Sequence, residues 1–426
     1  MSSTAANVTT DEPRRSSLKR AFTHAFAGNM IYTGCQGVMT IAMARLGPPE
    51  LLGTFGLGIA IAAPVVELFG LQLHVVEAVD TKGNNSFYQY FRVQCFTSTL
   101  AMLVVAAIAM LGPYRREAFW TILACGFSKI IEAASLVCHG KMQQTERTDL
   151  LASSLTIRGL SGVCALVLAV WLTSSVAIGV LALAFAWLAV LLCYDIPAAN
   201  SLEVVSESTE RFALASLMPL ALTALPLGLF AGMNSLMANA PRYFVECELG
   251  TRELGVFSAI AYLGLAARAF YTSILNAIVA RLADHHHHGE LKPFLRIIGK
   301  SLIAILALGI AGCLFVAFSG VYILMLFGRD YEDANDVLML LTASMAMKTL
   351  WNLFVSALYA MKQFKVIFIL QCTGGLFLFW LLSSWVDRYG LNGAAWAILV
   401  GSIFDVVIFS SVTLLILTYN RVHSNR

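Results

Sequence analysis

The chain repeats one short motif about half its length apart. Residues 46–55 read LGPPELLGTF, and residues 249–257 read LGTRELGVF. The offset is 203 residues up to a one-residue gap, which is close to half of the 426 residues. Each copy lies between two long apolar segments, so the two copies mark the same position in two halves of a duplicated membrane domain. A duplicated helical membrane protein without a soluble domain is typical of a transporter.

The composition is that of a protein that lies mostly in lipid. Hydrophobic residues make up 58% of the chain and charged residues 12%, whereas a soluble domain has about 25% charged residues. The spans must be helices, because lipid offers no hydrogen-bond partner to the backbone and the alternating pattern of a barrel is missing. Twelve runs reach the length of about 20 residues that a span needs, at 22–44, 51–73, 90–112, 117–139, 150–173, 175–195, 213–237, 254–280, 297–319, 334–360, 363–386 and 391–418.

These runs predict an all-α polytopic membrane protein with two six-helix bundles. Six spans bring the chain back to its starting side, so the internal repeat is parallel. The polar stretch at 197–211 is the expected linker between the halves. The predicted parts are a cytoplasmic tail at 1–21, an N-terminal lobe at 22–196, the linker at 197–211, a C-terminal lobe at 212–419 and a second tail at 420–426.

The distribution of Lys and Arg predicts the orientation. With the N-terminus inside, 17 of these residues fall in internal segments and 7 in external ones. This bias predicts a multi-pass protein of the cytoplasmic (inner) membrane with both termini in the cytoplasm. The formal net charge of +3 gives no reason to expect a nucleic-acid partner.

Ionisable side chains inside the predicted spans are the candidate functional residues. Each costs about 2.5–3.5 kcal/mol by insertion scales, so such groups normally face a cavity or one another. They are Glu67, Lys129, Glu132, Arg158, Arg268, Lys348 and Asp405.

The basic members of this set favour an anionic substrate. Arg268 has no acidic neighbour within its span, and Tyr262 and Tyr271 lie on nearby turns, so we expect it to face an anion in a wet cavity. Lys348 is interpreted in the same way. Arg158 lies nearer the cytoplasmic end, where it can snorkel to the interface.

The acidic members are candidates for ion coupling. Glu67 and Asp405 are the preferred sites for a proton or Na⁺. Glu132 ranks below them, because it lies three residues after Lys129 on one helix face and can be committed to that lysine. Either Lys129 and Glu132 bind ligands in the cavity, or each only neutralises the charge of the other.

No catalytic or metal-binding pattern is found. The chain has no GxxxxGK[ST] phosphate loop, no pair of histidines at metal-ligand spacing and no long external loop. We therefore expect neither an enzyme nor a cofactor nor a metal site, and we interpret the run His285 to His288 as a solvated loop.

The segment around the second motif copy resembles a known family. Residues 239–246 (NAPRYFVE) followed by 249–257 are similar to the loop between helices seven and eight of bacterial polysaccharide flippases, which belong to the multidrug/oligosaccharidyl-lipid/polysaccharide exporter superfamily. Residues 390–397 (GLNGAAWA) also resemble this family. We predict that Asn239 caps and Pro241 begins a short interfacial helix. The residues of the motif loop are Asn239, Pro241, Arg242, Tyr243, Gly250 and Gly255, with Arg242 and Tyr243 at the outer lipid boundary.

The resemblance implies a flippase for lipid-linked glycans. Such a protein moves a polyprenyl-diphosphate-linked oligosaccharide to the outer leaflet by ion-coupled alternating access, for assembly of O-antigen, capsule or exopolysaccharide. It also implies a monomer that works with polymerase and ligase machinery. The resemblance does not identify the cavity residues. The position of the residues within the spans and their charge give the cavity candidates, which are Arg268, Lys129, Lys348, Tyr262 and Tyr271.

Three alternatives are considered. A structural scaffold is disfavoured, because buried charges without a function are costly. A multidrug or other small-molecule exporter of the same superfamily would show an acid-dominated cavity. A membrane-embedded polymerase or ligase would show a large external loop.

Overall fold

The structure is a computed structural model that describes residues 18–80, 85–203, 214–264 and 291–424. Within these ranges every regular element is a helix. Nine of the described helices are long and apolar enough to cross a membrane. The all-α membrane fold expected from composition is therefore confirmed.

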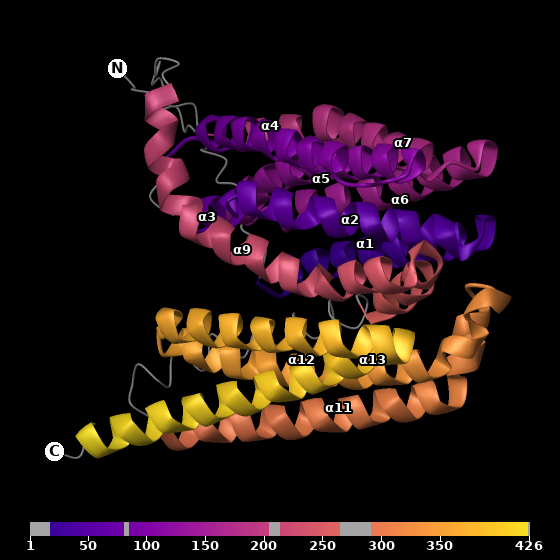
Figure 1. Ribbon diagram of the computed structural model, residues 1–426. Coiled ribbons are helices and arrows are strands. Elements are labelled where there is room, and N and C mark those ends of the chain that lie inside the picture. The colour runs from indigo at the N-terminus through magenta and orange to yellow at the C-terminus, as the bar shows by residue number, and fades with distance from the viewer. Residues whose placement is uncertain (1–17, 81–84, 204–213, 265–290, 425–426) are drawn as a thin grey trace, which may run out of the picture.

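The N-terminal helices form one bundle, coloured indigo to magenta in Figure 1. Within it α1 packs on α6, and α5 packs on α2, α4 and α7. The elements are α1 (Leu18–Leu46), α2 (Pro49–Phe69), α3 (Leu73–Val79), α4 (Phe87–Leu111), α5 (Arg116–Gln144), α6 (Thr148–Thr173), α7 (Val176–Val190), the π-helix η1 (Leu191–Asp195) and α8 (Ile196–Ser201).

The C-terminal helices form the second bundle, in which α12 packs on α11 and α13. Gly390 breaks α13 with a φ of 59°, so this element contains two of the predicted spans. The elements are α9 (Leu214–Leu249), a helical segment at 251–264, α11 (Leu291–Met325), the 3-10 helix η2 (Arg329–Ala334), α12 (Asn335–Ala360) and α13 (Phe364–Ser424).

Two local predictions are wrong. The predicted span at 51–73 ends early, because Leu71 and Gln72 adopt left-handed φ values of 53° and 51° and start the separate helix α3. No short helix begins at Pro241, which instead lies inside the continuous helix α9. The amide of Asn239 donates to the Ser235 carbonyl one turn back at 2.9 Å, so it does not cap a helix. Membrane helices tolerate an internal proline where neighbouring groups satisfy the freed carbonyl.

The two copies of the repeated motif lie against each other. A Cβ on Gly53 would overlap the carbonyl oxygen of Thr251, and a Cβ on Gly255 would overlap that of Pro49. Further along, Gly56 faces Ser258. Gly53 and Gly255 are equivalent positions of the repeat, so α2 and the helix at 251–264 cross in a pseudo-symmetric manner. We call this contact the glycine crossing. Glycines in this pattern let two membrane helices approach closely.

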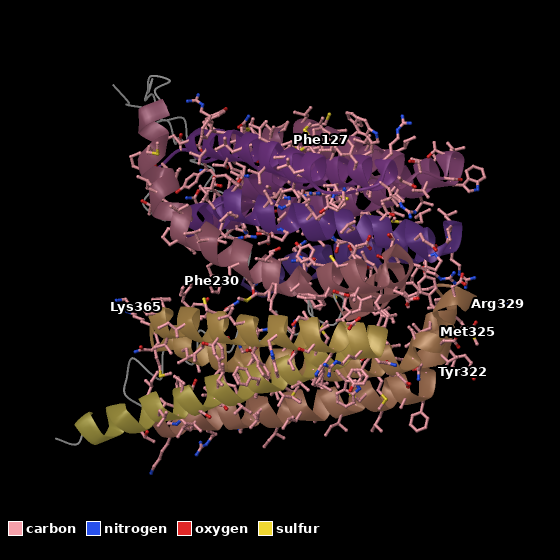
Figure 2. The ribbon with its side chains drawn as sticks, in the orientation of Figure 1. Phe127, Phe230, Tyr322, Met325, Arg329 and Lys365 are labelled. Atoms are coloured by element: carbon pink, nitrogen blue, oxygen red, sulfur yellow. The ribbon has the colours of Figure 1, made fainter. Side chains whose placement is uncertain are left out.

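The two bundles are joined at one end of the molecule. Figure 2 shows Arg329 and Lys365 at opposite ends, which we call the Arg329 end and the Lys365 end. One hydrophobic core covers the N-terminal bundle and continues into the Arg329 ends of α11, α12 and α13, whereas the Lys365 ends of these helices have a core of their own. Arg45, at the end of α1, donates to the carbonyls of Leu326 at 2.8 Å and Met325 at 2.5 Å.

Helix α9 connects the two bundles along its length. It packs on α2 of the N-terminal bundle and on α13 of the C-terminal bundle. The Gln371 amide donates to Asn234 Oδ1 at 3.0 Å, and Phe244 packs edge-on against Phe379. In the described residues the bundles are thus held together by the glycine crossing, by Arg45 and by α9.

The glycine crossing predicts that a glycine-to-alanine substitution changes the melting temperature differently at two helical positions. Gly53→Ala should lower the melting temperature of the purified protein, because overpacking of a tight contact costs about 1–3 kcal/mol. Gly34→Ala, which meets no atom within 4 Å, should leave it unchanged or raise it, since alanine is favoured over glycine in a helix by about 1 kcal/mol. Equal melting temperatures of the two variants would contradict the close crossing.

Candidate functional site

A cavity of about 90 Å³ lies in the N-terminal bundle between α2, α3, α4 and α5. Three of the residues predicted from the sequence line it together, namely Glu67, Lys129 and Glu132. His74 of α3 and Gln94 of α4 complete its polar wall. The Gln72 amide donates to Glu67 Oε2 at 2.8 Å, which fixes the carboxylate at the rim. The structure therefore brings one predicted cation and two predicted carboxylates into one cavity.

Glu132 is the centre of the charged network in this cavity. Lys129 Nζ lies 2.7 Å from Glu132 Oε2, as the three-residue spacing on one helix predicts. The Tyr32 hydroxyl of α1 donates to Glu132 Oε1 at 3.3 Å. The side chains of Lys129 and Glu132 are 27% and 18% exposed. Both partners are therefore partly accessible from the cavity, and their pairing leaves each able to meet a further ligand.

Arg158 contradicts the snorkelling prediction. It is 1% exposed and ends 4.0 Å from Glu132 Oε1. Its guanidinium lies over the Trp187 ring, 4.2 Å from the ring centroid, and the Trp187 indole N–H donates to the Arg158 carbonyl at 3.2 Å. A desolvated stack of arginine on tryptophan contributes about 2 kcal/mol. Arg158 is thus a second buried cation on the same carboxylate.

The sequence carried one signal for this burial. Gly162, one turn after Arg158 on α6, leaves the space that the Trp187 ring fills. The hydropathy profile shows how far along a span Arg158 lies but not which way its side chain points. The profile alone therefore predicts that Arg158 reaches the membrane interface.

The motif-loop residues make contacts between helices. The Tyr243 hydroxyl donates to the Ala60 carbonyl of α2. Arg242 donates to Asn239 Oδ1 at 2.5 Å and lies 5.6 Å from the ring centroid of Tyr262. The Tyr262 ring stacks with Phe55 at 6.4 Å. Arg242 and Tyr243 are half-buried, and their contacts connect α9 to α2 and to the helix at 251–264.

Tyr262 also lines a second, smaller cavity. This space of about 60 Å³ lies beside α1, with Gln36 and Thr40 on one side and Phe327 on the other. It is mostly apolar and lies near the junction of the two bundles. Gly250 has a φ of 91° and makes the turn after α9, while Gly255 lies in the glycine crossing.

The remaining candidates separate into two groups. Lys348 of α12 and Asp405 of α13 lie near each other in the C-terminal bundle, where the charge of Lys348 acts on Asp405 and Asp405 Oδ1 lies against Gly374. Arg268 and Tyr271, like the run His285 to His288, lie outside the described residues. Among the described residues no group of three or more His, Cys, Asp or Glu is placed to hold a metal ion.

A buried acid lies in the N-terminal bundle, on α3. Glu77 of α3 is 1% exposed, and neither of its carboxylate oxygens has a hydrogen-bond partner in the described residues. Burial raises the pKa of Glu77 to about 8, against the opposing charge of Lys141 and with a smaller contribution in the same direction from Glu203. Lys141 and Glu203 form an ion pair at 2.7 Å.

The described residues thus form two helical bundles that are joined at one end, with a charged cavity inside one bundle. Solved structures share this fold. A multidrug resistance MATE family transporter of the MOP superfamily in an outward-facing conformation is 12% identical, with 95% of this chain and 97% of that chain covered and a TM-score of 0.66. The inward-facing conformation of such a transporter has 13% identity, coverage of 95% and 96%, and a TM-score of 0.60.

A MOP superfamily transporter from Pyrococcus furiosus, described as having a binding pocket of reverse polarity, is 13% identical with coverage of 95% and 97% and a TM-score of 0.66. The chain therefore has the fold of the MOP-superfamily transporters. Among curated proteins, the capsular polysaccharide biosynthesis protein CapF of Staphylococcus aureus is 23% identical over 325 residues, which cover 75% of this chain and 80% of CapF. No protein-family model matches the chain.

Arg158 should contribute far more to stability than an exposed arginine. Arg158→Met should destabilise the protein by about 3–5 kcal/mol, because it leaves the carboxylate of Glu132 with one cation fewer in a buried site. Arg147→Met removes an exposed ion pair with Asp149 and should cost less than about 1 kcal/mol. Thermal unfolding of both purified variants measures the difference, and similar melting temperatures would contradict the buried network.

Glu77 predicts a decline in stability with rising pH. Its pKa is raised from 4.5 to about 8, so its contribution to stability is fully present below pH 4.5 and is lost as the pH rises through about 8. Glu77→Gln should flatten the fall of the melting temperature over this interval. The exposed Glu117→Gln should not, and an unchanged slope in Glu77→Gln would show that Glu77 is ionised in the folded protein.

Proposed function

We propose that the protein flips a polyprenyl-diphosphate-linked oligosaccharide across the cytoplasmic membrane for the assembly of a surface polysaccharide. The observation that carries this proposal is Lys129 on the cavity wall, backed by the buried Arg158 on the same carboxylate. A diphosphate is an anion that lysine and arginine bind well. The similarity to a capsular polysaccharide biosynthesis protein supports a glycan substrate.

Transport would follow an alternating-access cycle. In the structure the bundles meet at the Arg329 end, which the bias of Lys and Arg assigns to the outer face. Substrate then enters from the Lys365 end, on the cytoplasmic side where both termini lie. The diphosphate meets Lys129 while the lipid tail stays in the bilayer. Opening of the outer face requires the glycine crossing of α2 to separate and Arg45 to release the carbonyls of Met325 and Leu326.

The roles of the other candidates follow from their positions. Glu67 and Glu132 lie at the substrate cavity and Asp405 lies in the opposite bundle, so all three are candidates for binding the coupling H⁺ or Na⁺. Arg268, Lys348, Tyr262 and Tyr271 would extend the substrate path through the C-terminal bundle. The protein would act as a monomer that delivers substrate to polymerase and ligase enzymes.

A second candidate function is ion-coupled export of small molecules. Two carboxylates, Glu67 and Glu132, face one cavity, and acids in that position suit an organic cation. Solved proteins of this fold include multidrug transporters.

The experiment is a flipping assay in proteoliposomes with a polyprenyl-diphosphate glycan, with and without an ion gradient. Lys129→Gln should reduce the flipping rate by at least about tenfold, since a charge-assisted contact to the substrate is lost. Lys365→Gln, an exposed lysine outside the cavity, is the matched control. Gradient-driven efflux of small cations without glycan flipping would favour the second function.

One double variant separates binding from neutralisation. Both variants are assayed without an ion gradient, so that a coupling role of Glu132 does not enter. If Lys129 only neutralises Glu132, Lys129→Gln combined with Glu132→Gln should restore this flipping. If Lys129 binds the diphosphate, the double variant should flip no faster than Lys129→Gln.

A further inference from the structure

Three polar side chains form a buried hydrogen-bonded chain in the N-terminal bundle. His139 Nε2 of α5 lies 2.8 Å from Ser154 Oγ of α6, and the Ser154 hydroxyl donates to Asp195 Oδ1 at 2.6 Å. The three residues are 2%, 0% and 0% exposed. No ligand role assigned above uses this chain.

A local irregularity of the backbone places the carboxylate. Asp195 is the last residue of the π-helix Leu191–Asp195, which interrupts the helix between α7 and α8. A π-helical turn inserts one residue and so rotates the following side chains around the helix axis, and such turns occur frequently at functional sites. This turn aims Asp195 at α5 and α6 instead of at lipid.

The chain can hold a proton in two arrangements. A serine hydroxyl has one hydrogen, so when Ser154 donates to the Asp195 carboxylate, His139 Nε2–H must donate to Ser154 Oγ. When Asp195 carries a proton, it donates to Ser154, and Ser154 donates to the lone pair of His139 Nε2. Reversal of both hydrogen bonds therefore moves a proton between an imidazolium of His139 and the Asp195 carboxylate without moving a heavy atom.

The surroundings of the carboxylate are buried. Asp195 Oδ2 has no solvent contact in the described residues, and the neighbouring Ser135 hydroxyl acts on the Asp195 carboxylate as a hydrogen-bond donor. The charged and titratable groups that act on the chain are Arg158 of α6, His74 of α3, and Glu132 and Cys138 of α5. Since Arg158 also lies 4.0 Å from Glu132, the chain adjoins the charged network of the cavity.

We propose that Asp195, Ser154 and His139 form a proton-binding relay that couples a proton gradient to movement of the substrate. The proposal rests on the proposed ion-coupled transport and assigns H⁺ as the coupling ion. A hard cation prefers several oxygen ligands, whereas this site offers few free oxygens and an imidazole. Protonation of Asp195 would remove the negative charge facing Arg158, which is then held by Glu132 alone.

The first test needs no transport. Infrared difference spectra between acidic and alkaline pH, recorded on purified Glu77→Gln protein so that the buried Glu77 carboxyl does not contribute, should contain a protonated-carboxyl C=O band that Asp195→Asn abolishes and Asp149→Asn, an exposed control, retains. A band that survives in Asp195→Asn, with the same titration midpoint, would overturn the assignment. Because this readout is independent of the substrate, it stands even if no lipid-linked glycan is flipped.

The second test isolates the relay by a small substitution. Ser154→Ala should reduce gradient-driven flipping by at least about tenfold while leaving exchange without a gradient unchanged, and it should shift the Asp195 band in the infrared spectrum. Ser153→Ala, on the exposed face of α6, is the matched control and should change neither. Full gradient-driven flipping by Ser154→Ala would overturn the relay, as would equal loss with and without a gradient.

Discussion

The close crossing of α2 with the helix at 251–264 is the contact on which the arrangement of the two bundles depends. Backbone meets backbone there at Gly53 and Gly255, so no side chain separates the helices. Equivalent residues of a duplicated motif meet each other across the crossing, which explains why the motif is repeated at all. Contacts between small residues are also easily separated, because little apolar surface is lost when they part. A crossing of this kind suits a junction that must close and open.

Polar groups are concentrated inside the N-terminal bundle. Lys129, Glu132 and Arg158 lie next to the chain of His139, Ser154 and Asp195. Both groups use α5 and α6, and Asp195 is added by η1. Charges at this depth are costly unless they are paired or used. Substrate charge and coupling charge would then meet at Glu132 and Arg158, so that a change in one alters the field at the other.

Local patterns predicted the fold better than the site. The helical spans and the motif junctions followed from hydropathy and repetition, and the Lys129–Glu132 pair followed from a three-residue spacing on one helix. Contacts between segments that are distant in the sequence could not be predicted from these patterns. Arg158 was assigned to the interface because a profile gives depth but not direction, and the π-turn that orients Asp195 leaves no mark in the sequence. Proline often marks the first turn of a helix, which is why a helix start was predicted at Pro241. The prediction fails because, in a membrane protein, neighbouring groups can satisfy the carbonyl that an internal proline leaves free.

A disulfide across the glycine crossing tests most directly whether the bundles separate during transport. A Cβ at Gly56 would lie 3.2 Å from Ser258 Cβ, close to the separation of about 3.5–4.5 Å that a disulfide requires. Gly56→Cys with Ser258→Cys, in a background without the native cysteines, should cross-link under oxidation. Flipping should then stop and return on reduction. Unimpaired flipping by the fully cross-linked protein would show that the crossing stays closed throughout the cycle and would contradict the account.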